Sequence, residues 1–145
     1  MLLERMGPAL RTLGLSLWFG GGLAVLVGTR ALFRVAGSRK QGGQFSGALL
    51  QSFVWLRLLA LFAVCVAVLL GPHQSGAAVL LAALFVAGML VDARLRKLRD
   101  QIGGSTEGLE ASDPRRKRFG SLHGLSVLIL IGQILVAAAA LLLAG

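Results

Sequence analysis

The run FVWLRLLALFAVCVAVLLG, from Phe53 to Gly71, is followed after four residues by GAAVLLAALFVAGMLV, from Gly76 to Val91. A helix of about 17–20 apolar residues is long enough to cross the roughly 30 Å of hydrocarbon in a bilayer. Because backbone polar groups in lipid must be satisfied within the segment, both runs are expected to be transmembrane helices. The short Pro-His-Gln-Ser connection between them predicts a tight hairpin.

Two further apolar runs flank this hairpin, from about Leu13 to Thr29 and from Phe119 to Ala144. We therefore predict an all-α fold, a four-transmembrane-helix bundle that forms one integral membrane domain. The third helix should extend into the cytoplasm, because its apolar stripe continues to Ile102, just before two glycines. The expected segments, over residues 1–145, are helices at about 8–36, 47–71, 75–102 and 118–144, with a cytoplasmic loop at about 103–117.

The composition indicates the same class of protein. Apolar residues make up 56% of the 145 residues and charged residues 14%, with a mean hydropathy of +0.80. Soluble domains usually carry about 25% charged residues, so a cytosolic enzyme and a disordered chain are both excluded. The net charge of +9 would suggest nucleic acid in a soluble protein. Here the basic residues flank apolar runs, so they indicate topology and anionic lipid instead.

The basic residues also predict the orientation of the helices. Two of them, Arg5 and Arg11, precede the first run, four lie between the first and second runs, and eight lie between the third and fourth. The second connection and the C-terminus have none. Because cytoplasmic loops are enriched in Lys and Arg, both long connections should be cytoplasmic and both termini outside. We expect a multi-pass protein of the cell inner (plasma) membrane.

Small residues recur at helical spacing in two of the runs. Such spacing lets helix backbones approach closely, either within one chain or between copies of it. Both readings are open, and self-association through these faces would give a homo-oligomer. The residues are Ser16, Gly20, Ala24 and Gly28 in the first run, and Gly120, Gly124 and Gly132 in the fourth.

Four ionisable residues are predicted to lie at one depth, near the cytoplasmic ends of the helices: Arg30, Arg57, Asp92 and His123. Charges at membrane depth usually pair or face the bundle interior, so we expect an Arg57–Asp92 ion pair with His123 beside it. Such a cluster is either a structural clasp with snorkelling arginines or a polar vestibule for a proton, an anion or a metal.

The remaining motifs give little indication of chemistry. No CxxC, HxxxH or Met-rich cluster appears, so the ligand set of a metal site is missing, and His123 is the one candidate ligand. Ser126 follows His123 by three residues, but no orienting acid or oxyanion site accompanies them. The basic segment Arg115, Arg116, Lys117 and Arg118 precedes the last run. Polybasic segments at that position bind anionic lipid head groups.

Short motifs in the runs form a recognisable pattern: Arg118-Phe119, His123-Gly124-Leu125-Ser126 and Gly132 in the fourth, Trp18-Phe19-Gly20 in the first, and Asp92-Ala93-Arg94 after the third. This pattern resembles the transmembrane-protein-205-like family, small four-helix membrane proteins without a settled biochemical activity. The resemblance implies a distant similarity to bacterial copper-resistance membrane proteins and to a haem-associated oxidase family. It makes His123, Ser126 and Arg94 candidates for a shared site. Leu130 stands where the family often has an asparagine, which weakens the case for a polar or metal site at mid-membrane.

The leading hypothesis is a non-enzymatic transport or efflux-accessory protein. Its site would be the polar cluster of Arg30, Arg57, Asp92, Arg94, His123 and Ser126. The alternatives are a structural or lipid-binding assembly subunit and a copper- or haem-linked membrane protein. No cofactor or catalytic residue is expected. The expected partners are the bilayer, its anionic lipids, further copies of the chain and, as an open alternative, another membrane protein, but not nucleic acid.

Overall fold

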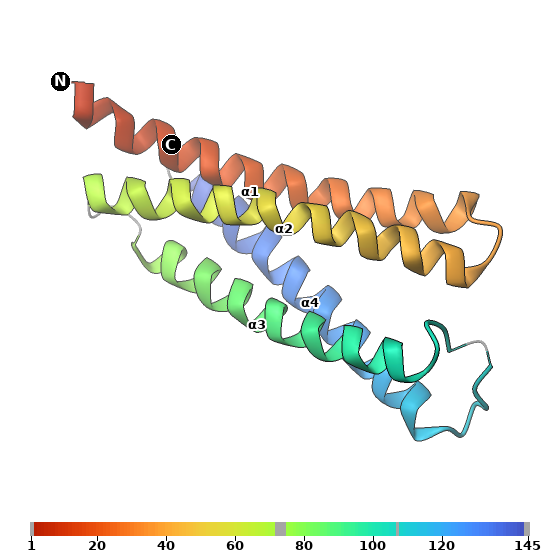
Figure 1. The fold of residues 1–145 in the computed structure, drawn as a ribbon. Coiled ribbons are helices and arrows are strands. Elements are labelled where there is room, and N and C mark those ends of the chain that lie inside the picture. The colour runs from red at the N-terminus through yellow and green to blue at the C-terminus, as the bar shows by residue number, and fades with distance from the viewer. Residues whose placement is uncertain (1, 72–74, 107, 144–145) are drawn as a thin grey trace.

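The computed structural model describes residues 2–71, 75–106 and 108–143, and within these ranges the chain is entirely helical apart from its connections. The predicted fold class is therefore confirmed. The predicted Pro72–Ser75 turn lies almost wholly outside the described residues. The four helices run up and down in chain order (Figure 1): α1 Leu2–Val35, α2 Arg39–Leu70, α3 Ser75–Gln101 and α4 Pro114–Leu142.

Three helices begin earlier than predicted, and in two of them, α2 and α4, the start is set by a capping group rather than by apolar residues. Ser38 caps α2: its Oγ accepts from the Gln41 backbone N–H at 3.1 Å, while Gln41 Oε1 accepts from the Gly37 N–H at 3.1 Å. This reciprocal arrangement is close to a capping box. α2 thus starts at Arg39, eight residues before the expected position 47.

The other two early starts involve proline. Asp113 caps α4 by accepting from the Arg115 N–H at 2.8 Å, and Pro114 occupies the first helical position, where its missing N–H costs nothing. The expected start at 118 was therefore four residues late. α1 starts at Leu2 rather than at about 8 and continues through Pro8.

The end of α3 agrees with its prediction. Gly103 and Gly104 have positive φ values of 72° and 91°. The Gly104 N–H donates to the Arg99 carbonyl at 2.9 Å, and the Gly103 N–H donates to the Asp100 carbonyl at 3.3 Å. These two bonds are those of a Schellman motif, which ends a helix with residues in the left-handed region.

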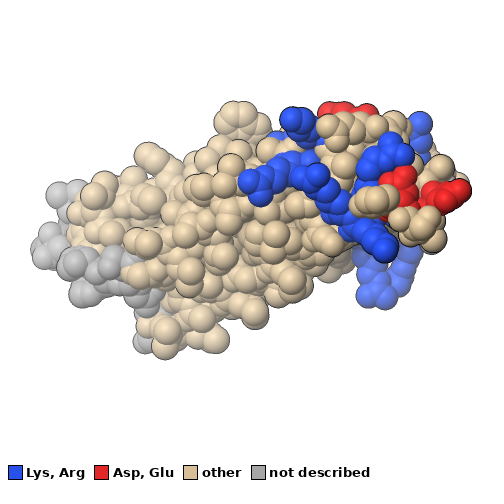
Figure 2. Space-filling model, turned by 90° about the horizontal axis from the view of Figure 1, so that it is seen from below, with Lys and Arg blue, Asp and Glu red and all other residues tan. Residues whose placement is uncertain are grey.

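The surface around the helices is strongly apolar. All four helices contain spans long and apolar enough to cross a membrane, and large side chains such as Trp55, Phe62 and Leu135 are exposed along them. Figure 2 shows Lys and Arg side chains gathered toward one end of the face in view. An apolar belt with charge at one end suits a bilayer and not water. The chain is a multi-pass integral membrane protein.

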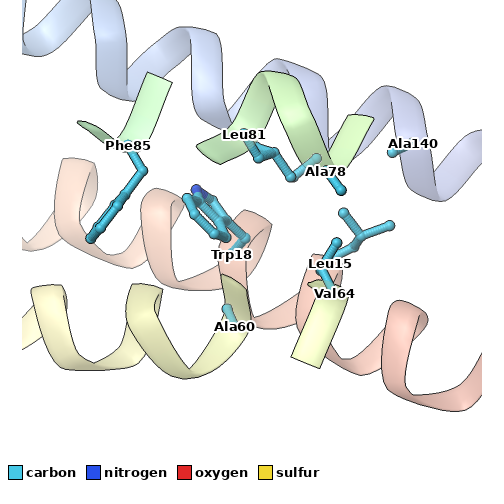
Figure 3. Packing of buried hydrophobic residues seen from close by; sticks show 9 residues of the cluster. Leu15, Trp18, Ala60, Val64, Ala78, Leu81, Phe85 and Ala140 are labelled. Carbon is cyan, nitrogen blue, oxygen red and sulfur yellow. The ribbon is translucent and has the colours of Figure 1, made fainter. Parts of the chain in front are cut away.

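The helices form two hairpins, α1–α2 and α3–α4, that pack on each other in one half of the bundle (Figures 1 and 3). The prediction that the second and third helices form a tight hairpin is wrong, because α2 packs mainly on α1 and α3 mainly on α4. Trp18 lies at the centre of this half, with its ring edge-on to Phe85 at a centroid distance of 6.0 Å. We call this region the closed half and define it by its buried cluster, which consists of Leu15, Trp18, Ala60, Val64, Ala78, Leu81, Phe85, Ala137 and Ala140.

Glycines bring α1 and α2 together, but the closest approach is at Gly14, which was not among the predicted small residues. A Cβ atom on Gly14 would lie 2.8 Å from the Ala60 carbonyl oxygen, whereas one on Gly20 would meet nothing within 4 Å. Ser16, Gly20 and Ala24 are exposed. This part of the predicted stripe faces away from the other helices and does not serve packing within the chain.

The remaining predicted small residues divide in the same way. Gly28 and Gly132 lie near α2 and α3 respectively, since Cβ atoms there would be 3.2 Å from Leu49 and 3.8 Å from Leu84. Gly120 and Gly124 are exposed, with open space around them. Only two of the seven predicted positions therefore lie at contacts between helices.

Candidate functional site

Beyond the closed half, the two hairpins diverge toward the end that carries the α1–α2 turn and the α3–α4 loop (Figure 1). A cavity of about 130 Å³ lies between them there. We call this region, defined by the residues that line the cavity, the open half. The polar side chains in the lining are Thr29, Ser46, Arg57, Asp92, Arg99, His123, Ser126 and Gln133, and apolar side chains of all four helices complete it.

Gln133 of α4 lies at the inner end of the cavity and contacts the three other helices. Its Oε1 accepts hydrogen bonds from Trp18 Nε1 of α1 at 3.3 Å and from Arg57 Nη1 of α2 at 3.4 Å. Its Nε2 donates to the Leu84 carbonyl of α3 at 2.9 Å. The side chain is fully buried. Gly88 lies beside it, because a Cβ there would be in ordinary van der Waals contact with Gln133 Nε2, at 3.5 Å.

Arg57 is the only one of the predicted polar residues that is deeply buried, with 5% of its surface exposed. Its guanidinium carbon lies 5.1 Å from the centre of the Phe53 ring and 5.5 Å from that of Phe85, which gives it two cation–π contacts. Among the described residues, its Nε has no hydrogen-bond partner. Arg57 was expected near the cytoplasmic end of its helix, but it lies eighteen residues after the first residue of α2, near the middle of that helix.

Asp92 lies on the opposite wall of the cavity, where Ser126 binds it. Ser126 Oγ donates to Asp92 Oδ1 at 2.7 Å, a bond that links α4 to α3. The Arg57 and Asp92 side chains, both of which the structure describes, do not form the direct ion pair that was predicted. The reason is that each has a nearer partner: Gln133 and the two rings for Arg57, and Ser126 for Asp92.

His123 and Arg99 lie at the outer part of the cavity, and both contact Phe119. The His123 ring stacks on the Phe119 ring at 6.4 Å with an interplanar angle of 10°, and the Arg99 guanidinium carbon lies 5.9 Å from the same ring centre. His123 is exposed. The structure thus places four of the six predicted cluster residues around one cavity. Arg30 and Arg94 are exposed and do not line it.

Sequence reasoning missed four polar residues of the cavity: Thr29, Ser46, Arg99 and Gln133. Gln133 had a readable signal, because an amide in the middle of an apolar run needs a hydrogen-bonding partner in the bilayer. Ser46 was missed because it precedes the expected start of its helix. Arg99 was considered only as one of the basic residues that predict the orientation of the helices.

Across the described ranges, three or more His, Cys, Asp or Glu side chains nowhere come together in a way that could hold a metal ion. Of the residues that the family resemblance implies, His123 and Ser126 share the cavity and Arg94 lies outside it.

The basic segment Arg115–Arg118 is exposed at the start of α4. Asp113 forms a salt bridge with Arg115 at 2.8 Å. Hydrogen bonds from the Arg115 side chain and backbone N–H hold the pKa of Asp113 below its usual value. Arg116 donates to the Leu109 carbonyl at 3.2 Å and so tethers the preceding loop. Cations therefore cluster at the surface beside the mouth of the cavity.

Comparison of the chain with protein-family models, with curated proteins and with solved structures gave no match. The fold and the site define a four-helix integral membrane protein with a polar cavity between two hairpins.

Proposed function

We propose that the protein is a non-enzymatic transport or efflux-accessory protein whose solute site is the cavity between the two hairpins. The observation that carries this proposal is a cavity lined by all four helices with a buried arginine at its inner end. Ionisable residues inside membrane segments are costly and usually mark a pathway or a binding site. The arrangement also resembles transporters in general, which bind solutes near the membrane midplane between helical repeats or bundles.

We further propose that the open half faces the cytoplasm of a plasma (inner) membrane, with both termini outside. The concentration of Lys and Arg in the two connections of the open half supports this orientation. Labelling of single cysteines, placed at Gly37 and Gly108 in a chain with Cys65 replaced, tests it. Both sites should react only after the membrane is permeabilised, and labelling of either one in intact cells would reverse the orientation.

Solute movement is tested in liposomes that contain the purified protein and a panel of labelled organic anions, cations and neutral solutes. Arg57→Ala and His123→Ala should each slow the release of the transported class relative to wild type. Arg30→Ala, which removes an exposed arginine outside the cavity, is the matched control. Equal release by wild type and both cavity variants, with circular dichroism showing intact helices, would refute the transport proposal.

A structural role in lipid binding is the second candidate, because the exposed basic segment supports it independently of the cavity. Under this alternative, changing Arg115, Arg116, Lys117 and Arg118 to Gln should abolish binding to anionic vesicles, while Arg57→Ala leaves it nearly unchanged. Association of copies through the exposed face of Ser16, Gly20 and Ala24 is compatible with either role. Membership of the transmembrane-protein-205-like family remains a hypothesis that rests on the short motifs.

A further inference from the structure

The inner end of the cavity holds a cation whose hydrogen-bonding capacity is mostly unused. A guanidinium group has five N–H donors, and the described residues give that of Arg57 one hydrogen bond, at 3.4 Å to a neutral amide. Its Nε is buried and has no partner within the part of the chain that the structure describes. A charge removed from water needs a counter-charge or strong hydrogen bonds to be stable. The arginine is therefore prepared for an acceptor that the described residues do not supply.

The obvious internal acceptor, Asp92, is held elsewhere. Its Oδ1 is bound by Ser126 at 2.7 Å on the far wall. The cavity also contains a second guanidinium, that of Arg99, so its lining has two arginines and one carboxylate. The electrostatic balance favours an anion between the hairpins and disfavours a cation.

The rest of the cavity is suited to a small apolar body. Val25, Leu50, Leu95 and Leu130 contribute hydrocarbon walls, and the volume is about 130 Å³. Cavities of about 150 Å³ hold a molecule the size of benzene. Ser46 adds a buried hydroxyl without a partner in the lining.

We propose that this cavity binds an organic oxyanion, a carboxylate or phosphate attached to an apolar body, with Arg57 as the anion-binding residue. Arg57 donates to the oxyanion, a planar match that can be bidentate. Ser46 lies eleven residues before Arg57 on α2, about 16 Å along the helix axis, so its hydroxyl is too far away to bind the same oxyanion. Ser126 is a positioning residue, because it keeps the Asp92 carboxylate away from Arg57. The inference deepens the proposed function by naming the class of solute, and it rests on the same cavity.

Fluorobenzoate and its neutral isostere fluorobenzamide provide matched probes, titrated by fluorine NMR against the full-length protein in phosphatidylcholine nanodiscs. Fluorobenzoate should bind and fluorobenzamide should not. Arg57→Gln should weaken fluorobenzoate binding roughly 10- to 100-fold, the usual range for a charge-assisted contact. Arg30→Gln, the control at an exposed arginine, should leave it unchanged.

Two further variants separate loss of binding from loss of fold. Asp92→Asn removes the competing carboxylate and should tighten fluorobenzoate binding several-fold, a gain that misfolding cannot produce. Ser126→Ala frees Asp92 to approach Arg57 and should weaken binding about 3- to 10-fold, and the double variant with Asp92→Asn should recover it. If Ser126→Ala weakens binding equally with and without Asp92→Asn, the positioning role is wrong.

The oxyanion could come from the water phase or from a lipid head group, and adding phosphatidylglycerol to the nanodiscs distinguishes them. If phosphatidylglycerol displaces fluorobenzoate and is retained by wild type but not by Arg57→Gln in native mass spectrometry, the ligand is a lipid phosphate. If it does not displace the probe, the ligand is a free organic acid. Equal binding of fluorobenzamide, or tight binding of inorganic phosphate alone, would overturn the proposal. Binding is measured without a solute gradient, so its result is independent of the transport assay. Fluorobenzoate binding without solute release would refute only the transport proposal, and solute release without fluorobenzoate binding would refute only the oxyanion proposal.

Discussion

The closed half and the open half of the bundle are built from the same four helices but differ in how tightly those helices pack. In the closed half, alanines such as Ala60 and Ala137 are fully buried and the hairpins interlock around Trp18. In the open half, the hairpins diverge around a cavity with polar side chains on its walls. Gln133 lies between the two regions and bonds to the three other helices. This difference shows that the residues that pack the helices tightly and the residues that line the cavity lie along separate lengths of the same bundle.

The largest expected effect is on stability and comes from shortening the same side chain in each half. Leu81→Ala removes a fully buried side chain of the closed half and should lower the free energy of unfolding by about 2–4 kcal/mol. Leu50→Ala, at the wall of the existing cavity, should cost less than about 1 kcal/mol, since little packing is lost there. Unfolding in mixed micelles, followed by circular dichroism, measures both. Equal losses would mean that the two halves are packed alike.

The next effect tests how closely α1 and α2 approach in the closed half. Gly14→Leu places carbon atoms against the Ala60 carbonyl and should destabilise the bundle by about 1–3 kcal/mol through overpacking. Gly20→Leu, on the outward face of the same helix, meets open space and should change monomer stability little. If Gly20→Leu lowers the subunit number in native mass spectrometry, that outward face is an interface between copies.

Replacing Gln133, which lies between the closed half and the open half, should lower the free energy of unfolding by an intermediate amount. Gln133→Leu eliminates three hydrogen bonds and leaves Trp18 Nε1 and Arg57 Nη1 without their acceptor. Individual hydrogen bonds between membrane helices are worth about 0.6 kcal/mol on average, so a loss of roughly 1–2 kcal/mol is expected. Indole N–H signals in NMR spectra should shift with it. An unchanged indole N–H chemical shift would contradict the hydrogen bond from Trp18 Nε1 to Gln133.

The smallest expected effect concerns the exposed start of α4, at the margin of the open half. Hydrogen bonds from Arg115 lower the pKa of Asp113, so the cap is present above the usual carboxyl pKa of about 3.9 and is lost as the pH falls through the lower, folded value. A carboxyl titration followed by carbon NMR should give a midpoint below about 3.9. Arg115→Gln should return that midpoint toward the usual value. A normal midpoint in wild type would rule out the cap.

The number of helices and the end of α3 could be predicted because hydropathy and paired glycines report them directly. The starts of α2 and α4 could also have been read, from Ser38 with Gln41 and from Asp113 with Pro114, but apolar runs alone placed them too late. The sequence could not predict which face of each helix points into the bundle. Helices that are apolar toward both lipid and core carry little amphipathic signal, so nothing in the pattern showed that Gly14 faces inward and Gly20 outward.

The candidate site was predictable in its residue types more than in its geometry. Arg57, Asp92, His123 and Ser126 all line the cavity, because a charge inside a span signals a polar interior whatever the exact packing. The direct pairing of Arg57 with Asp92 was wrong, since it depends on the separation of the hairpins and on Ser126. Both are tertiary features that no spacing in the sequence encodes.

The bonds of Gln133 also bear on how the bundle is completed. Its three partners belong to the three helices that are synthesised before it. The amide of Gln133 is fully satisfied only when all three of those helices pack against α4, so its hydrogen bonds depend on the complete bundle. A bundle with one helix misplaced would leave part of this amide unpaired in hydrocarbon, which costs free energy.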